Sequence, residues 1–208
     1  MKEQKEYLQD IAEIKSLMER STRFLSLSGI SGILIGIYAL LGVGIVHFLM
    51  GFDSRLNSTE DLDGLKGNRD LSAVVLLATV ILVLSLSTGY WFSYQKAMSA
   101  GQKMWNSTSR TMMWHFMVPL AMGGCMMLLL LSKGMYEWLA PLSLLFYGLG
   151  LYSVSKFTFS ELRGLGWLEM GLGLVGLCFP STGLWCWALG FGVGHIVYGY
   201  FIHHKYEK

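Results

Sequence analysis

Six apolar segments constrain this sequence more than any other feature. They span residues 24–50, 71–94, 111–131, 138–155, 162–179 and 184–204. A helix needs about 20 apolar residues to cross a hydrocarbon core of roughly 30 Å. Charged residues make up only 14% of the 208-residue chain, whereas they make up about a quarter of a soluble domain. We therefore expect an all-α integral membrane protein, with six transmembrane helices in three hairpins and a single membrane domain over residues 24–208.

The basic residues indicate how such a chain would be oriented. Twelve of the 16 Lys and Arg residues fall on one side: in the N-terminal segment, the second connection, the fourth connection with the first turn of the fifth span (Lys156 and Arg163), and the tail. Arg55, Lys66, Arg69 and Lys133 fall on the other side. Cytoplasmic connections carry the excess of basic residues. We therefore expect a multi-pass plasma (inner) membrane protein with both termini in the cytoplasm. The charged start of the chain does not resemble a cleavable signal peptide, so the first span would be an uncleaved anchor.

Residues 1–23 are expected to form an amphipathic cytoplasmic helix. Tyr7, Ile11, Ile14 and Met18 recur at helical spacing, and five acidic residues balance five basic ones. This helix could dock on the cytoplasmic face of the same chain, on a second copy in a homo-oligomer, or on another protein. The alternative is a helix at the membrane surface, although a net basic face is missing. The net charge of +2 gives no indication of nucleic-acid binding.

An acid and an imidazole interrupt the last two apolar segments. Pro180-Ser-Thr-Gly183 predicts a turn, so the two helices must run antiparallel. Glu169 lies twelve residues before Ser181, and His195 lies thirteen residues after Thr182. Both residues should therefore lie about 18–20 Å from the turn, near the bilayer midplane. We predict that Glu169 and His195 form a buried polar pair.

Two interpretations of this pair remain open. It can be a structural hydrogen bond that holds the two helices in register, or a site that responds to protons or coordinates a substrate. Ionisable residues inside a membrane are functional candidates by default, because an unpaired charge there costs about 3 kcal/mol or more. A neutral Glu bonded to a neutral His and a carboxylate–imidazolium pair would both avoid that cost.

Glycines at three- and four-residue steps indicate close helix packing. They form one stripe on the first span and one on each helix of the last hairpin, where they share a face with Glu169 or with His195. We expect the two stripes of the hairpin to face each other. The packing glycines are Gly29, Gly32, Gly36, Gly166, Gly173, Gly176, Gly192 and Gly199.

The third span and the cysteines suggest weaker alternatives. Pro119 should kink the third span, and a stripe of His115, Met122, Cys125 and Met126 on this span has the soft ligands that suit Cu(I). Methionine is also ordinary core material, so we assign no metal or cofactor. Cys178 and Cys186 flank the last turn, so either a disulfide or two buried free thiols would fit.

The segment from Gly164 to Gly199, a Gly-rich helix, a Phe-Pro turn and a second Gly-rich helix, resembles the hairpin units of the HdeD-type acid-resistance membrane proteins. That family is similar in outline, with six helices in three hairpins. The long acidic first loop and the N-terminal amphipathic helix depart from the plan. We therefore transfer no function from this resemblance.

No hydrolase, zinc-protease, phosphate-binding or dinucleotide-binding motif occurs in the sequence, and we assign no catalytic residues. We expect a small sensor or an assembly or stress-related membrane protein, with a proton-responsive Glu169–His195 pair. A small proton-coupled transporter or channel is the main alternative. An intramembrane lipid enzyme and Cu(I) handling are further alternatives.

Overall fold

In a computed structural model, the described residues 26–49, 68–101 and 104–207 form six helical rods without strands. The predicted helix at residues 1–23 and most of the predicted acidic loop lie outside these residues. The rods are α2 (Gly29–Gly44) continued by η1 (Ile45–Leu49), α4 (Asn68–Ser99), α5 (Ser107–Ser132), η3 (Tyr136–Trp138) with α6 (Leu139–Val154), α7 (Glu161–Cys178), and η4 (Pro180–Thr182) with α8 (Gly183–Trp187), η5 (Ala188–Gly194) and α9 (His195–Tyr206).

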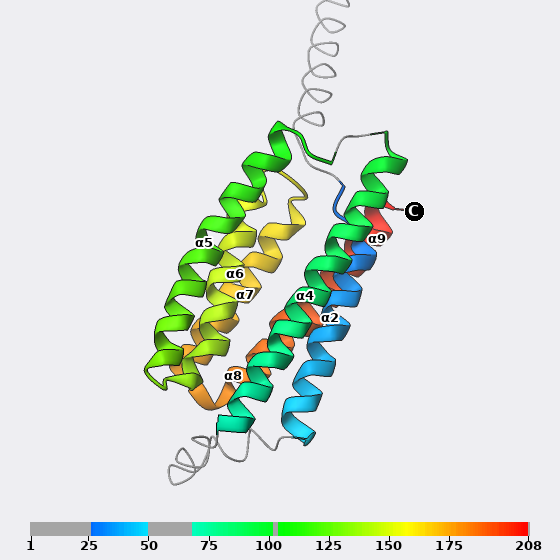
Figure 1. Cartoon of the computed structure of the whole chain (residues 1–208). Helices are drawn as coiled ribbons and strands as arrows, with labels where there is room; N and C mark the ends of the chain where they lie inside the picture. Colours follow the sequence, from blue (N-terminus) through cyan, green and yellow to red (C-terminus); the bar gives the residue numbers. More distant parts are fainter. Residues whose placement is uncertain (1–25, 50–67, 102–103, 208) are drawn as a thin grey trace, which may run out of the picture.

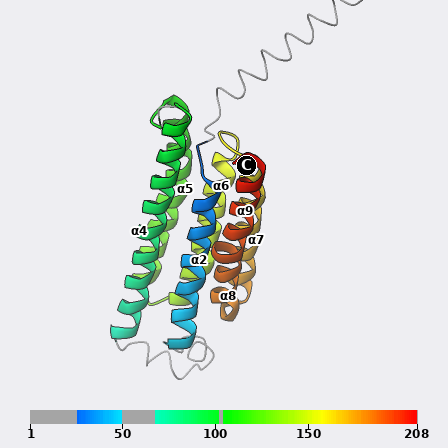
Figure 2. The same ribbon diagram turned by 90° about the vertical axis from the view of Figure 1, so that its right-hand side faces the viewer.

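The rods are arranged in two layers of three (Figures 1 and 2). In the first layer, α2 packs between α4 and α9; in the second, α6 packs between α5 and α7. The layers meet at one end of the bundle, where α8 and η5 contact α6 and α7. They meet again at the other end, where the Phe159 ring lies 4.5 Å from the ring of Tyr206 and 5.4 Å from Lys96 Nζ.

Glycines produce the closest helix contacts within each layer. In the first layer, a Cβ atom added to Gly199 would lie 2.5 Å from the carbonyl oxygen of Gly29 and 2.6 Å from the amide nitrogen of Ile33. In the second layer, a Cβ on Gly166 would lie 2.9 Å from the carbonyl oxygen of Gly148. Only glycine allows backbones to approach this closely. We call these two contacts, α2 with α9 and α6 with α7, the glycine seams.

The partners of the last two glycine stripes differ from our expectation. Gly173 of α7 faces backbone atoms of Pro141 and Leu145 in α6, and Gly192 of η5 faces the side chain of Leu40 in α2. The two helices of the last hairpin therefore use these glycines against their neighbours within a layer, not against each other. A stripe of glycines reveals a face that can pack closely, but any other smooth helix face can fill it.

Four helices are long and apolar enough to span a membrane: Gly29–Phe48, Ser72–Ser99, Ser107–Ser132 and Pro180–Tyr206. The remaining two predicted spans also form helices, but α6 has only 16 residues. α7 has 18 residues and contains Glu161, Arg163 and Glu169. The described residues therefore form an all-helical bundle of membrane-protein type. α5 runs through Pro119 without interruption, and it begins with a capping box between Asn106 and Ser109.

A carboxylate joins the ends of three helices at one end of the bundle. Glu207 accepts hydrogen bonds from the Gly29 amide (2.9 Å), Lys96 Nζ (2.8 Å) and His203 Nδ1 (2.7 Å). Lys96 also donates to the carbonyl oxygen of Leu27 at 2.7 Å. The contact with the first turn of α2 is favourable because the N-terminus of a helix attracts negative charge. This junction links α2, α4 and α9, the whole first layer.

Gly199→Ala should destabilise the protein, because the new methyl group meets backbone atoms of α2 that cannot move independently. We expect a loss of about 1–3 kcal/mol, measured as a lower midpoint of thermal denaturation in detergent. Gly124→Ala is the matched control, because a Cβ there has no atom within 4 Å. An equal loss in both variants would contradict the first glycine seam.

Glu207→Gln should flatten the acid side of the stability profile. Burial alone would raise the pKa of Glu207, but hydrogen bonds from Lys96, His203 and the Gly29 amide outweigh it and lower the pKa from its ordinary 4.5 to about 2. A carboxylate with a lowered pKa stabilises the folded state above about pH 4.5, and this contribution is lost as the pH falls towards 2. Thermal denaturation of both proteins across this range measures the effect. Parallel profiles would contradict it.

Candidate functional site

Glu169 and His195 lie together in the interior of the bundle. Glu169 projects from the middle of α7, and His195 is the first residue of α9. His195 Nδ1 lies 3.4 Å from Glu169 Oε1, and the two side chains are 5% and 0% exposed. Neither carboxyl oxygen has a hydrogen-bond partner among the described residues. The contact is therefore an ion-pair distance without hydrogen-bond geometry.

Tyr147 completes the polar site from the second layer. Its hydroxyl lies 2.9 Å from His195 Nε2, the ring nitrogen that points away from Glu169. The Tyr147 ring also packs against the rings of Phe191 at 4.8 Å and Phe116 at 5.8 Å. The imidazole therefore has a polar partner at each ring nitrogen, Tyr147 of α6 at Nε2 and the Gly190 carbonyl oxygen of η5 at Nδ1. The surrounding aromatic rings keep the site apolar apart from these groups.

The last rod changes its winding immediately before His195. Ala188–Gly194 forms a π-helix, with glycine at every second position from Gly190 to Gly194. Short π-helical turns inside α-helices frequently occur at functional sites. The carbonyl oxygen of Gly190 lies 3.3 Å from His195 Nδ1, and a Cβ on Gly190 would lie 2.5 Å from Glu169 Oε2. Gly190 therefore supplies an acceptor for the imidazole and leaves space for the carboxyl group.

This geometry allows a limited set of proton positions. The Gly190 carbonyl oxygen can only accept, so a proton on Nδ1 faces two acceptors, Gly190 and Glu169. The Tyr147 hydroxyl can donate to an unprotonated Nε2 or accept from a protonated one. A lone carboxylate at Glu169 would have no donor other than Nδ1, and burial makes such a charge costly. The two arrangements that avoid it are the neutral pair and the carboxylate–imidazolium pair.

The stripe of possible soft ligands on the third predicted span lies away from the buried pair. His115, Met122, Cys125 and Met126 are all exposed on α5, and the His115 ring lies 5.0 Å from the ring of Phe157. The structure does not bring this stripe to the buried Glu169–His195 pair. Among the described residues, no group of three or more His, Cys, Asp or Glu side chains could hold a metal ion.

The three cysteines are free thiols. Cys125 and Cys178 are exposed, and Cys186 is buried. Cys186 Sγ lies 3.7 Å from the hydroxyl oxygen of Thr182. Cys178 and Cys186 therefore do not form the disulfide that was one of the two sequence-based alternatives, and only Cys186 occupies a buried position.

The sequence argument did not assign a role to Tyr147, Gly190 or Glu207. Depth could have suggested Tyr147, because it lies nine residues after Trp138, about one helical turn short of the level expected for His195. The glycines at positions 190, 192 and 194 were a local signal of unusual winding. No sequence pattern indicated that Glu207 would reach the start of α2.

Gly190→Ala should disturb the pair directly. The new methyl group would lie 2.5 Å from Glu169 Oε2 and 2.6 Å from Leu144 Cδ2, so the carboxyl group must leave its position. We expect a loss of about 1–3 kcal/mol, measured by thermal denaturation in detergent. Gly171→Ala on α7 is the control, because its Cβ meets no atom within 4 Å. Unchanged stability in the Gly190 variant would contradict the close fit.

Comparison with known proteins adds no relative to this description: no family model, no curated protein and no solved structure matches the chain. The likeness of the last hairpin to HdeD-type proteins is accordingly not reflected in any match. The function must be argued from the geometry of the site.

Proposed function

We propose that this chain is a small proton-responsive protein of the plasma (inner) membrane. Six helices would cross the membrane, and both termini would lie in the cytoplasm. The even number of helical rods in the described residues and the Lys and Arg distribution support this topology. The responsive element is the Glu169–His195 pair.

The fully buried carboxyl group of Glu169 is the observation that carries the proposal. It lies 3.4 Å from an imidazole and has no hydrogen-bond partner among the described residues. Groups this close titrate as a unit, not as two independent sites. With one shared proton the pair has no net charge, whether that proton is on the acid or on the base. Loss of that proton leaves a buried negative charge, and a second proton leaves a buried positive charge; nothing described beside the pair neutralises either one.

The position of the pair explains how protonation could alter the structure. Tyr147 and Glu169 belong to the second layer, whereas Gly190 and His195 belong to the rod that reaches into the first layer. The pair therefore lies at the contact between the two layers. A change in its charge would alter the free energy of that contact, and thus how the layers are held together. This is the behaviour required of a sensor.

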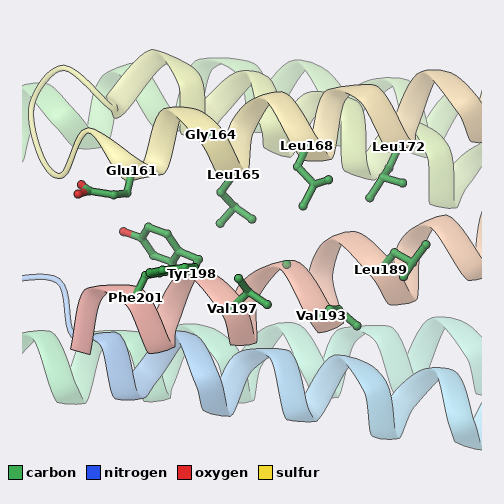
Figure 3. A pocket seen from close by; sticks show the side chains of 11 residues that line it. Glu161, Gly164, Leu165, Leu168, Leu172, Leu189, Val193, Val197, Tyr198 and Phe201 are labelled. Carbon is green, nitrogen blue, oxygen red and sulfur yellow. The ribbon is translucent and has the colours of Figure 1, made fainter. Parts of the chain in front are cut away.

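A proton-coupled transporter or channel would use the same residues differently. It requires a water-filled path that reaches the carboxyl group. The Glu169 side chain is 0% exposed. An apolar surface groove runs between α7 and the last rod, where Leu168 and Leu172 face Leu189 and Val193 (Figure 3), and neither Glu169 nor His195 lines it. These observations favour the sensor over the transporter. An enzyme would need further polar groups that converge on the pair. Among the described residues, hydrogen bonds join the pair only to the Tyr147 hydroxyl and the Gly190 carbonyl oxygen.

We expect the wild-type protein in detergent to lose thermal stability as the pH rises from about 5 to about 8 and the pair gives up its shared proton, because a lone buried carboxylate at Glu169 is costly. Glu169→Gln should remove this dependence, because a glutamine amide has no proton to give up and therefore cannot leave a lone carboxylate beside the imidazole. The measurement is the denaturation midpoint as a function of pH.

Glu137→Gln is the control, because Glu137 is an exposed acid in η3, ten residues before Tyr147. It should keep the wild-type pH dependence. A wild-type protein with a flat profile would rule out a proton response. A Glu137 variant that is as flat as the Glu169 variant would show a general effect of charge.

A further inference from the structure

A proton response of the buried pair requires a route by which protons reach it. Glu169 and His195 are 0% and 5% exposed, so neither side chain exchanges protons with bulk water directly. His195 Nδ1 faces Glu169 and the Gly190 carbonyl oxygen, and a backbone carbonyl cannot pass a proton on. Nε2 faces the Tyr147 hydroxyl at 2.9 Å, and a hydroxyl can accept one proton while it donates another. The geometry therefore favours Nε2 as the point where protons enter and leave.

A second tyrosine, Tyr198, lies one helical turn after His195 on α9. Its ring lines the surface groove, but its hydroxyl is buried and points towards the end of the groove where Glu161 lies (Figure 3). The ring thus separates the hydroxyl from the outside of the bundle. Tyr147 and Tyr198 both pack against one apolar cluster, which consists of Leu151, Val154, Leu162 and Leu165.

The Tyr198 hydroxyl has no hydrogen-bond partner among the described residues. Buried polar groups are nearly always paired, and an internal water molecule serves those that the protein leaves without a partner. Glu161 of α7 and Tyr206 of α9 interact electrostatically with Tyr198, and Tyr198 in turn interacts with Tyr147 of α6. From α5, the side chains packed on the same cluster are the apolar Met112 and Phe116. Tyr198 therefore lies between the pair and the end of the bundle.

The end of the bundle beyond Tyr198 has groups that exchange protons with water. Glu161 accepts a hydrogen bond from the Tyr206 hydroxyl at 3.1 Å and forms an ion pair with Lys205. The side chains of Glu161 and Lys205 are 25% and 61% exposed. A partly exposed carboxylate can collect protons from water and release them to it. Glu161 thus provides an outer terminus for a route that begins at His195.

The opposite direction, towards the last turn, is packed with apolar groups. Leu144 and Pro141 lie on that side of Tyr147 in α6, and both are almost completely buried. Gly173 is in close contact with the backbone of α6 at Pro141. Near the turn, the Cys186 thiol lies 3.7 Å from the Thr182 hydroxyl. The polar groups described here therefore favour a route from the pair towards Glu161.

We propose that protons travel between the pair and the Glu161 end through the hydroxyls of Tyr147 and Tyr198, with one water molecule held at Tyr198. In the carboxylate–imidazolium form, Nε2 transfers its proton to the Tyr147 oxygen while that hydroxyl releases its own proton towards Tyr198. Tyr198 passes a proton on in the same way, and Glu161 or water takes the last one. The neutral pair reaches this form when Nδ1 takes the carboxyl proton. Each tyrosine ends with one hydroxyl proton, so only the pair and the final acceptor change charge.

This inference rests on the proposed proton response and adds the side from which the protons come. A chain of hydroxyls with a single water molecule carries protons but admits no ion or substrate. It is therefore compatible with a fully buried Glu169 and with a sensor, whereas a transporter needs a continuous water-filled path.

The rate of protonation tests the route. The full-length protein in detergent is shifted rapidly from pH 8 to pH 5, and time-resolved infrared difference spectra follow the pair. Bands of the pair are identified as those that Glu169→Gln lacks. Equilibrium spectra across the same range give the midpoint of the titration. The route determines how fast the proton arrives, whereas the environment of the pair determines the midpoint, so the two readouts separate a relay from a structural role.

Tyr198→Phe should slow the appearance of these bands about tenfold or more, because a phenyl ring cannot pass a proton on. It should leave the midpoint unchanged, because Tyr198 makes no hydrogen bond to the pair. Tyr147→Phe should also slow them, and it should shift the midpoint because it removes the hydrogen bond to His195. Tyr200→Phe is the matched control, two residues along α9 and 59% exposed; it should keep the wild-type rate.

Two results would overturn the route and leave the proton response intact: a wild-type rate in Tyr198→Phe, or equal slowing in Tyr198→Phe and Tyr200→Phe. Wild-type spectra that do not change between pH 5 and pH 8 would remove the proposed function and the route together. Equal denaturation midpoints of wild type and Tyr198→Phe at pH 5 would show that the variant folds normally.

Discussion

Direct backbone contact at the two glycine seams determines which helices are neighbours. The hydrocarbon core provides no hydrophobic force between apolar helices, so close van der Waals contact must replace it. Gly199 against α2 and Gly166 against α6 provide that contact. Each seam joins two helices within one layer, and α4 and α5 add to the outer sides. The two layers are consequently better packed internally than against each other.

The candidate site lies where the two layers meet. Near the last turn, α8 and η5 bridge the layers, and this contact encloses the Glu169–His195 pair with Tyr147. Farther along, α7 and α9 diverge and leave the groove. One hairpin thus contributes both the buried polar pair and an apolar surface groove. The π-helical winding of η5 adjoins both, since Gly190 makes room for the carboxyl group and Gly194 lines the groove.

The meeting of Glu169 and His195 followed from simple counting. Two antiparallel helices joined by a short Pro-containing turn place residues at equal distances from the turn at equal depth, whatever the rest of the fold does. Counting could not show that the carboxyl oxygens lack hydrogen-bond donors or that Tyr147 approaches from α6, because those facts depend on a helix outside the hairpin. The partners of the glycine stripes were mistaken for the same reason.

The sequence by itself determined the helical segments, the depth of the acid and the imidazole, and the glycines at which helices come close. Periodicity and distance along the chain encode these features locally. Only the tertiary structure decided which glycine faces meet, how η5 winds around the carboxyl group, and that Glu207 joins the starts and ends of three helices. Such choices depend on the fit between side chains far apart in the sequence, and many pairings of apolar helices satisfy the same local pattern.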